Sequence, residues 1–127
     1  MYNRISAKDV RRTAAEIHWE GDSKEVLSGF PSDVKLGLGY SLRRLHNGEF
    51  PACETRSMPS IGKGVWELKE SDERAWYRVV YLTKIGGVIH VLYCFEKESR
   101  RTDKRDVATA RARLKQVLNR IQGDKNR

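Results

Sequence analysis

The fold is decided by residues 75–95, which read AWYRVVYLTKIGGVIHVLYCF. Two runs rich in Val, Ile, Tyr and Trp flank Gly86-Gly87, and two such runs around a tight glycine connection are typical of a β-hairpin. The expected strands are 75–83 and 88–95, and a third strand signal at 65–69 precedes them. We therefore expect an antiparallel sheet at the centre of this protein.

Segments on both sides of this sheet show helical periodicity. Apolar residues recur every three or four positions from Pro31 to His46, and a second amphipathic segment covers 103–122, with arginine and lysine on its other faces. A short alternating run at 16–20 predicts an early strand, whereas 48–64 is expected to be a loop. The order indicates an α+β fold with three to four antiparallel strands, an N-terminal helix or helices and a basic C-terminal helix.

Length and composition limit the class of protein. The chain has 127 residues, a size that fits one domain, which we place at 14–127 behind a polar extension at 1–13. Only two distant cysteines are present, the start has no apolar leader, and no apolar run is long enough for a membrane span. We therefore expect a cytoplasmic protein without disulfides. No metal-ligand spacing or glycine-rich phosphate loop occurs, so no metal and no cofactor are expected.

The excess positive charge lies at the end of the chain. Residues 97–127 hold 11 basic and 4 acidic residues, whereas 1–96 hold 14 and 13. A basic segment attracts polyanions, so nucleic acid is the expected partner; a merely solvated helix is the alternative. A membrane surface is not expected, because no aromatic residue follows Phe95. The candidate RNA-contacting cations are Arg100, Arg101, Lys104 and Arg105.

Arg78 stands out because it lies within an apolar strand, where an unpaired guanidinium would be costly. One interpretation is a structural ion pair with Glu67 on the neighbouring strand. The other is a phosphate-binding arginine, because a hairpin loop of even length would put Arg78 on one face of the sheet with Tyr93 and Lys97.

The same pairing places other residues of the hairpin. Trp76 and Phe95 are expected opposite one another beside Arg78, where they could stack on RNA bases or pack the sheet. His90 is expected on the other face against Tyr81, which favours a structural histidine over a catalytic base.

The strands also carry a family likeness. Their succession resembles the RelE/HigB superfamily of toxins, and in particular its phage-derived HigB-like branch, through GVWELK at 64–69, YRVVY at 77–81 and VLYCFEKES at 91–99. The upstream runs GFP at 29–31 and GYSL at 39–42 are similar to the helix of that branch. The resemblance covers roughly residues 17–121.

This resemblance implies a RelE-like fold, similar to that of microbial ribonucleases. It also implies a metal-independent endoribonuclease that cleaves messenger RNA on the ribosome and so inhibits translation. The implied partner is a helix-turn-helix antitoxin, bound in a toxin–antitoxin hetero-oligomer. By position, Arg78 matches the family's central-strand arginine, Lys97 matches the basic residue after the last strand, and Lys69 lies near a basic position on the preceding strand.

Two positions depart from the family pattern. Tyr93 stands where the family often has histidine, and Glu98 stands where it often has a second lysine. A tyrosine has an unperturbed pKa of about 10, so Tyr93 can act as a base near neutral pH only if its pKa is lowered. Glu98 adds a negative charge beside the expected phosphate site.

The candidate catalytic residues are therefore Arg78, Lys97, Tyr93 and Lys69. Arg78 would stabilise the phosphorane, and Lys97 would neutralise charge or protonate the leaving group. Tyr93 or Lys69 would be the base or a positioning group. The alternative functions are a non-catalytic module that binds nucleic acid or the ribosome, and a phage accessory protein.

Overall fold

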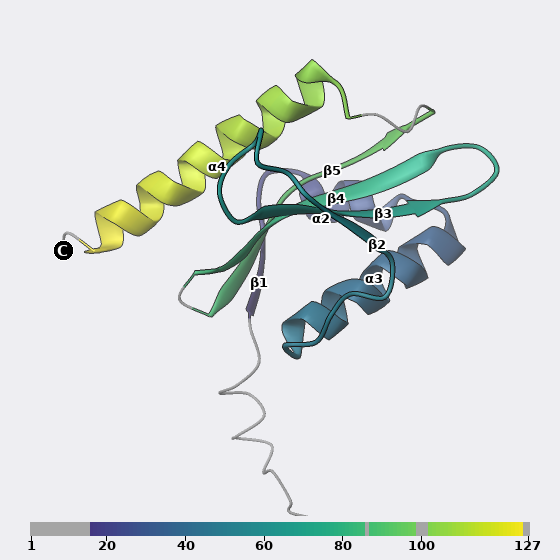
Figure 1. The fold of residues 1–127 in the computed structure, drawn as a ribbon, viewed down its shortest axis with the longest axis horizontal. Helices are drawn as coiled ribbons and strands as arrows, with labels where there is room; N and C mark the ends of the chain where they lie inside the picture. Colours follow the sequence, from purple (N-terminus) through teal and green to yellow (C-terminus); the bar gives the residue numbers. More distant parts are fainter. Residues whose placement is uncertain (1–15, 86, 99–101, 126–127) are drawn as a thin grey trace, which may run out of the picture.

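The computed structural model describes residues 16–85, 87–98 and 102–125 (Figure 1). The expected extension at 1–13 lies outside them. Across the described residues, no helix combines the length and the apolar content that crossing a membrane requires. The elements along the chain are β1 (Glu16–Trp19), α2 (Ser23–Ser28), α3 (Ser32–His46), β2 (Glu54–Ser57), β3 (Val65–Ser71), β4 (Trp76–Ile85), β5 (Val88–Lys97) and α4 (Lys104–Lys125).

The strands form one five-stranded sheet in the order β1-β5-β4-β3-β2. Strands β2 to β5 pair antiparallel, and β1 pairs parallel with β5 at the far edge. The α+β class is confirmed, but the sheet is mixed and has one strand more than expected. The additional strand, β2, lies within the expected loop. Its residues ETRS have no apolar alternation, so pairing with β3 rather than their own pattern makes them a strand.

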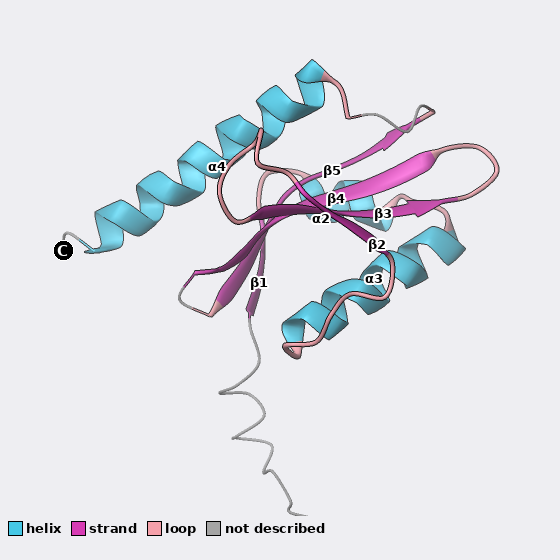
Figure 2. Cartoon of the chain, viewed as in Figure 1, coloured by secondary structure: helices cyan, strands magenta, loops and turns pink. Residues whose placement is uncertain are grey.

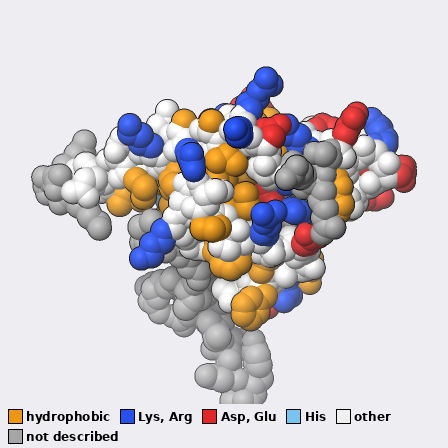
Figure 3. All heavy atoms as spheres, turned by 45° about the horizontal axis from the view of Figure 1, so that its top comes forward, with side chains coloured by type: hydrophobic (Ala, Val, Ile, Leu, Met, Phe, Trp, Pro, Cys, Tyr) orange, Lys and Arg blue, Asp and Glu red, His pale blue; other side chains and the backbone are white. Residues whose placement is uncertain are grey.

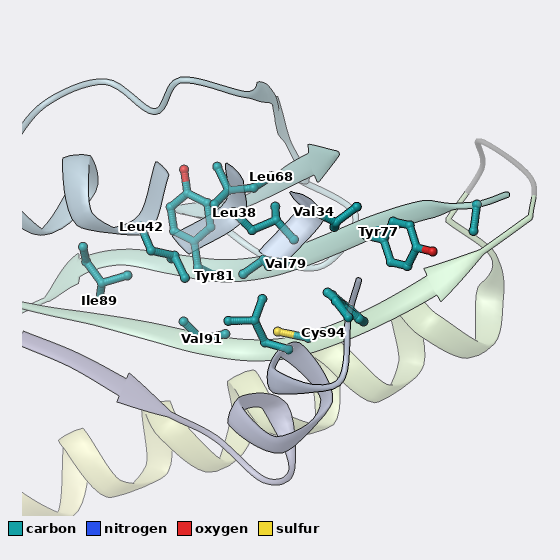
Figure 4. Close-up of a cluster of buried hydrophobic side chains, with 13 residues drawn as sticks. Val34, Leu38, Leu42, Leu68, Tyr77, Val79, Tyr81, Ile89, Val91 and Cys94 are labelled. Atoms are coloured by element: carbon teal, nitrogen blue, oxygen red, sulfur yellow. The ribbon is translucent and has the colours of Figure 1, made fainter. Parts of the chain in front are cut away.

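Helices cover both faces of the sheet, as Figure 2 shows. The first face, which we call the α3 face, packs against α2 and α3 through an apolar cluster (Figure 4). Helix α3 follows Pro31, buries Val34, Leu38 and Leu42 at helical spacing, and ends before Asn47, as the sequence indicates. Helix α2 was not expected, because six residues with one buried leucine carry little periodic signal.

The second face, which we call the α4 face, packs against the C-terminal helix. The predicted stripe of α4 is confirmed, because Ala110, Leu114 and Val117 are buried while Val107 and Ile121 pack against them at the edge. The strand side of this contact contains Val65, Val80, Leu82, Leu92 and Phe95, and Met58 and Ile61 extend it.

The β4–β5 hairpin keeps the expected parity from Trp76 to Val80 and loses it at Tyr81 and Leu82, after a bulge. Arg78 lies opposite Phe95 and Val80 opposite Tyr93, but the register shifts between Val80 and Tyr81. Beyond that point His90 lies opposite Leu82, on the α4 face. The expectation that His90 packs against Tyr81 on the other face is therefore wrong, because a bulge reverses the alternation of side chains.

Candidate functional site

Charged and hydrogen-bonding side chains gather at the end of the α4 face where α4 begins. We call this group the polar cluster, and it contains Glu67, Lys69, Arg78, Tyr93, Lys97, Thr102, Asp103 and Asp106. Arg78, Tyr93 and Lys97 are thus on one face, as the pairing argument expected, and Lys69, which the family resemblance named, lies on the same face opposite Arg78. They come from three adjacent strands: Lys69 from β3, Arg78 from β4, and Tyr93 and Lys97 from β5.

Arg78 is the centre of the polar cluster and is 0% exposed. Its Nη1 atom lies 3.5 Å from Glu67 Oε1 and donates to the Thr102 hydroxyl. That hydroxyl donates in turn to Glu67 Oε2 at 2.8 Å. The guanidinium also lies 5.8 Å from the centre of the Phe95 ring. The structural ion pair with Glu67 is therefore present, and Thr102 covers the guanidinium from the β5–α4 connection.

Lys69 lies beside this pair and is also buried. Its ammonium is 3.9 Å from Glu67 Oε1 and 3.6 Å from Glu54 Oε2. Because Lys69 lies directly opposite Arg78 in the β3–β4 register, the two cations share Glu67. Lys69 is thus held between two carboxylates, an arrangement that suits charge neutralisation better than proton abstraction.

Tyr93 and Lys97 meet at Asp106, a buried residue in the first turn of α4. The Tyr93 hydroxyl donates to Asp106 Oδ1 at 3.1 Å, and Lys97 Nζ lies 3.0 Å from Asp106 Oδ2. Burial and, next, the hydrogen bond to Asp106 raise the pKa of Tyr93. Tyr93 therefore stays protonated near neutral pH. The lowered pKa that a base role requires is not found, so its hydroxyl is a donor.

Lys97 reaches the surface, with its side chain 25% exposed, whereas Lys69 and Arg78 are buried. Its ammonium donates to Asp103 and contacts Asp106, and these contacts raise its pKa. The same contact with Lys97 lowers the pKa of Asp103 to about 2. Lys97 is therefore a stable cation at the surface, suited to hold a phosphate rather than to give up a proton.

The predicted RNA-contacting residues lie in different surroundings. Phe95 is buried and stacks on Tyr93, with ring centres 4.8 Å apart, so it packs the sheet rather than offering a face to a base. Half-buried Trp76 lies opposite Lys97 and not opposite Phe95 as expected. Lys104 and Arg105 are exposed at the start of α4, whereas Arg100 and Arg101 lie outside the described residues. In Figure 3, basic side chains lie scattered among hydrophobic and acidic ones.

Sequence reasoning missed Thr102, Asp103 and Asp106. A signal was available for the two aspartates, because Asp103 Oδ1 accepts the Asp106 backbone N–H at 3.2 Å, and an acidic residue just before a helix is typical of an N-cap. Thr102 had no such signal, since its partners lie 24 and 35 residues away in the sequence.

The polar cluster can stabilise a phosphate once its own carboxylates move away from the cations that they pair with. Its three cations are each matched by acidic groups, so an incoming phosphate group would replace aspartate or glutamate as the partner. Lys97 reaches the surface, whereas Arg78 lies beneath Thr102. Among the described residues, no group of three His, Cys, Asp or Glu side chains is placed to hold a metal ion.

Comparison with known proteins agrees with this architecture. A search of curated proteins finds no match. Among solved structures, this chain is similar to a mutant of the E. coli toxin RelE in the free state. The TM-score is 0.54 at 16% identity, and the match covers 80% of this chain and 97% of that one. At this identity the match establishes the fold, so the expected RelE-like architecture is confirmed.

The sequence also matches a protein family. Residues 25–115 match the family described as Phage derived protein Gp49-like (DUF891). This match spans most of the chain and includes β3, β4, β5 and the first half of α4. The chain therefore belongs to the Gp49-like family of phage-derived proteins, a family of RelE/HigB-type toxins.

Proposed function

We propose that this protein is the toxin of a toxin–antitoxin pair, an endoribonuclease that cleaves messenger RNA on the ribosome and is neutralised by a cognate antitoxin. The observation that carries the proposal is the convergence of Arg78, Lys97 and Tyr93 at one end of the α4 face. Two cations and a hydroxyl donor in one place are what a reacting phosphodiester needs. Membership of the Gp49-like family supports the same conclusion.

In the proposed reaction, the ribose 2′-hydroxyl attacks the adjacent phosphate. A cyclic phosphate forms as the bond to the 5′-oxygen breaks; a water molecule takes the proton of the 2′-hydroxyl, and the leaving 5′-oxygen takes a proton from water. Lys97 and Arg78 stabilise the negative charge that builds up on the phosphorane, and Tyr93 donates a hydrogen bond from its protonated phenol. The raised pKa values of Tyr93 and Lys97 support these roles, because both groups keep their protons near neutral pH.

The burial of Arg78 sets a condition on this proposal. A phosphate can contact the guanidinium only after the hydrogen bond from Arg78 to Thr102 breaks. Lys97 meets the RNA first because its side chain reaches the surface, and Arg78 engages second. The ribosome holds the RNA in a fixed position. Contacts between the protein and this ordered RNA would then supply the binding energy for the rearrangement.

Primer extension on a messenger RNA translated in vitro tests the proposal. Wild-type protein should produce cuts at ribosome-occupied codons, and the variants Arg78→Ala and Lys97→Ala should remove at least about 99% of them. Because Arg78 is buried, its variant needs a check of folding by circular dichroism; Lys97→Ala is the variant that leaves the core intact. Lys115→Ala, which removes an exposed charge from α4, is the matched control and should cut normally.

A second candidate function is non-catalytic binding of RNA or the ribosome. It is favoured by the pairing of Lys69, Arg78 and Lys97 with carboxylates, which leaves the polar cluster near neutrality. Wild-type protein that sediments with ribosomes yet leaves messenger RNA uncut would favour this function. Cuts that persist in both Arg78→Ala and Lys97→Ala would contradict the catalytic assignment.

A further inference from the structure

Helix α3 carries a feature that its packing does not explain, a glycine between two surface hollows. The first hollow, of about 370 Å³, lies between β1 and α3 and is lined mainly by apolar side chains, including Trp19 and Leu42. The second, of about 380 Å³, lies on the outer side of α3 beside Leu36 and Tyr40. Gly39 lines both hollows.

Gly39 is present at an energetic cost, since glycine within a helix destabilises it relative to alanine. None of the described residues approaches Gly39 closely enough to require a glycine, because a Cβ atom there would meet nothing within 4 Å. Gly37 is different, because a Cβ there would lie 2.2 Å from Glu70 Oε2. Gly37 thus has a neighbouring side chain, Glu70, that would have to shift, whereas no described residue lies close to Gly39.

The surface around Gly39 is apolar and basic. Leu36 is 71% exposed and Tyr40 is 52% exposed, one helical turn apart. Lys35 and Arg43 line the second hollow, and none of the described residues that line either hollow is acidic. Exposed apolar side chains next to hollows of this kind mark an interaction surface, and the positive rim selects a partner with negative charge.

We propose that this surface binds an acidic amphipathic helix of the antitoxin, which crosses α3 at Gly39. The missing side chain lets the partner helix approach α3 closely, so that its apolar residues enter the hollows on either side. Its carboxylates then face Lys35 and Arg43. The identification of the partner as the antitoxin rests on the proposed function, whereas the shape and charge of the surface do not.

Two other occupants fit less well. A second copy of this chain would place Arg43 against Arg43, and like charges across an interface oppose association. An RNA strand gains affinity from phosphate contacts and base stacking; Trp19, Arg43 and His46 line part of the first hollow, but its other side chains, Ile17, Leu27 and Leu42, are aliphatic and offer neither kind of contact. Protein with mixed apolar and acidic side chains matches both hollows.

Substitution of two helical glycines that have free space around them, Gly39 and Gly123, tests the inference. Gly39→Gln fills the space between the hollows with a neutral side chain, and Gly123→Gln is the matched control in α4, where a Cβ also meets nothing within 4 Å. Both variants should unfold at a slightly higher temperature than wild type, because glutamine is a better helix former than glycine. A loss of binding in Gly39→Gln then cannot be attributed to unfolding.

The probes are the purified products of the reading frames that flank the gene, titrated into the full-length chain by calorimetry. One product should bind, with affinity reduced about 30-fold by Gly39→Gln, about tenfold by Arg43→Glu, and unchanged by Gly123→Gln. Equal affinity of wild type and Gly39→Gln, or no binding by either product, would overturn the inference.

Primer extension on the same samples separates this inference from the proposed function. Gly39 lies on the α3 face, across the sheet from the polar cluster, so Gly39→Gln should cut messenger RNA like wild type. If wild type makes no cuts but a flanking product still binds through Gly39, the proposed function fails and the docking surface stands.

Discussion

The two faces of one sheet differ in what they bury. On the α3 face, the strands present an apolar cluster to α2 and α3. On the α4 face, the apolar cluster covers only part of the sheet, and beyond it the same strands present Glu67, Lys69 and Arg78, all at most 4% exposed. The same backbone thus supports an ordinary core on one side and buried charge on the other.

This difference indicates where stability and function reside. Apolar burial stabilises a fold whatever the protein does, whereas buried ion pairs often contribute little or even destabilise relative to apolar replacements. We infer that the buried charged residues of the α4 face serve binding of a ligand rather than stability of the fold.

Glu67→Ala should have the largest effect, a loss of about 3–5 kcal/mol in the free energy of unfolding. The variant leaves the fully buried Arg78 and Lys69 without their shared carboxylate. Urea denaturation followed by tryptophan fluorescence measures this loss. The double variant Glu67→Leu with Arg78→Met removes the arginine charge and leaves Lys69 paired with Glu54, so it should restore most of the lost stability while abolishing RNA cleavage. A double variant as unstable as Glu67→Ala would mean that the ion pair itself holds the fold together.

Leu38→Ala tests the α3 face and should destabilise by about 2–5 kcal/mol. Leu38 is 0% exposed within the apolar cluster, so the variant leaves a cavity. Leu36→Ala, on the same helix with its side chain exposed, is the control and should stay within about 0.5 kcal/mol of wild type. At temperatures where Leu38→Ala is folded, its cleavage of RNA should be normal. A specific loss of cleavage would show that the two faces are coupled.

Thr102→Val should cost about 1.5–3 kcal/mol, because it removes a hydroxyl that bonds to two buried charged groups while preserving shape. The hydroxyl accepts from Arg78 and donates to Glu67. Thr109→Val is a suitable comparison, since Thr109 bonds only to a backbone carbonyl on α4. Thermal unfolding of the three proteins checks the difference. Equal stabilities would mean that Thr102 covers the polar cluster without supporting it.

The two faces also differ in how well they can be read from the sequence. The helix at 32–46, the central hairpin and the apolar stripe of α4 follow from periodicity, which reports burial of one side of a regular element. Strand β2 gave no such signal, because its partner β3 supplies the pairing. The gathering of Arg78, Tyr93 and Lys97 followed from strand parity and from the family resemblance.

What could not be predicted depends on contacts distant in the sequence. The bulge between Val80 and Tyr81 reversed the placement of His90, which lies 3.2 Å from Glu20 across 70 residues. A bulge of one residue has no periodic signature, since it interrupts the pattern that is being counted. Likewise, nothing in the local sequence of Arg78 indicated that Thr102 covers it.

The smallest effect concerns the rim of the polar cluster, where Asp103 pairs with Lys97. Because this contact lowers the pKa of Asp103 from 3.8 to about 2, its stabilising effect is present above pH 4 and is lost as the pH falls toward 2. Asp103→Asn keeps an N-cap for α4 but removes the charge, so the stability of this variant should fall less steeply than that of wild type across this range.

Urea midpoints at pH 5 and pH 2.5 in low salt measure how steeply the stability of each protein falls with pH, with Glu73→Gln, at an exposed position, as control. The difference should shrink in 0.5 M salt, because the Asp103 side chain is 52% exposed and screening weakens surface pairs. Equal slopes for wild type and Asp103→Asn would show that Lys97 is held by Asp106 alone, which would place the charge balance of the polar cluster within its buried part.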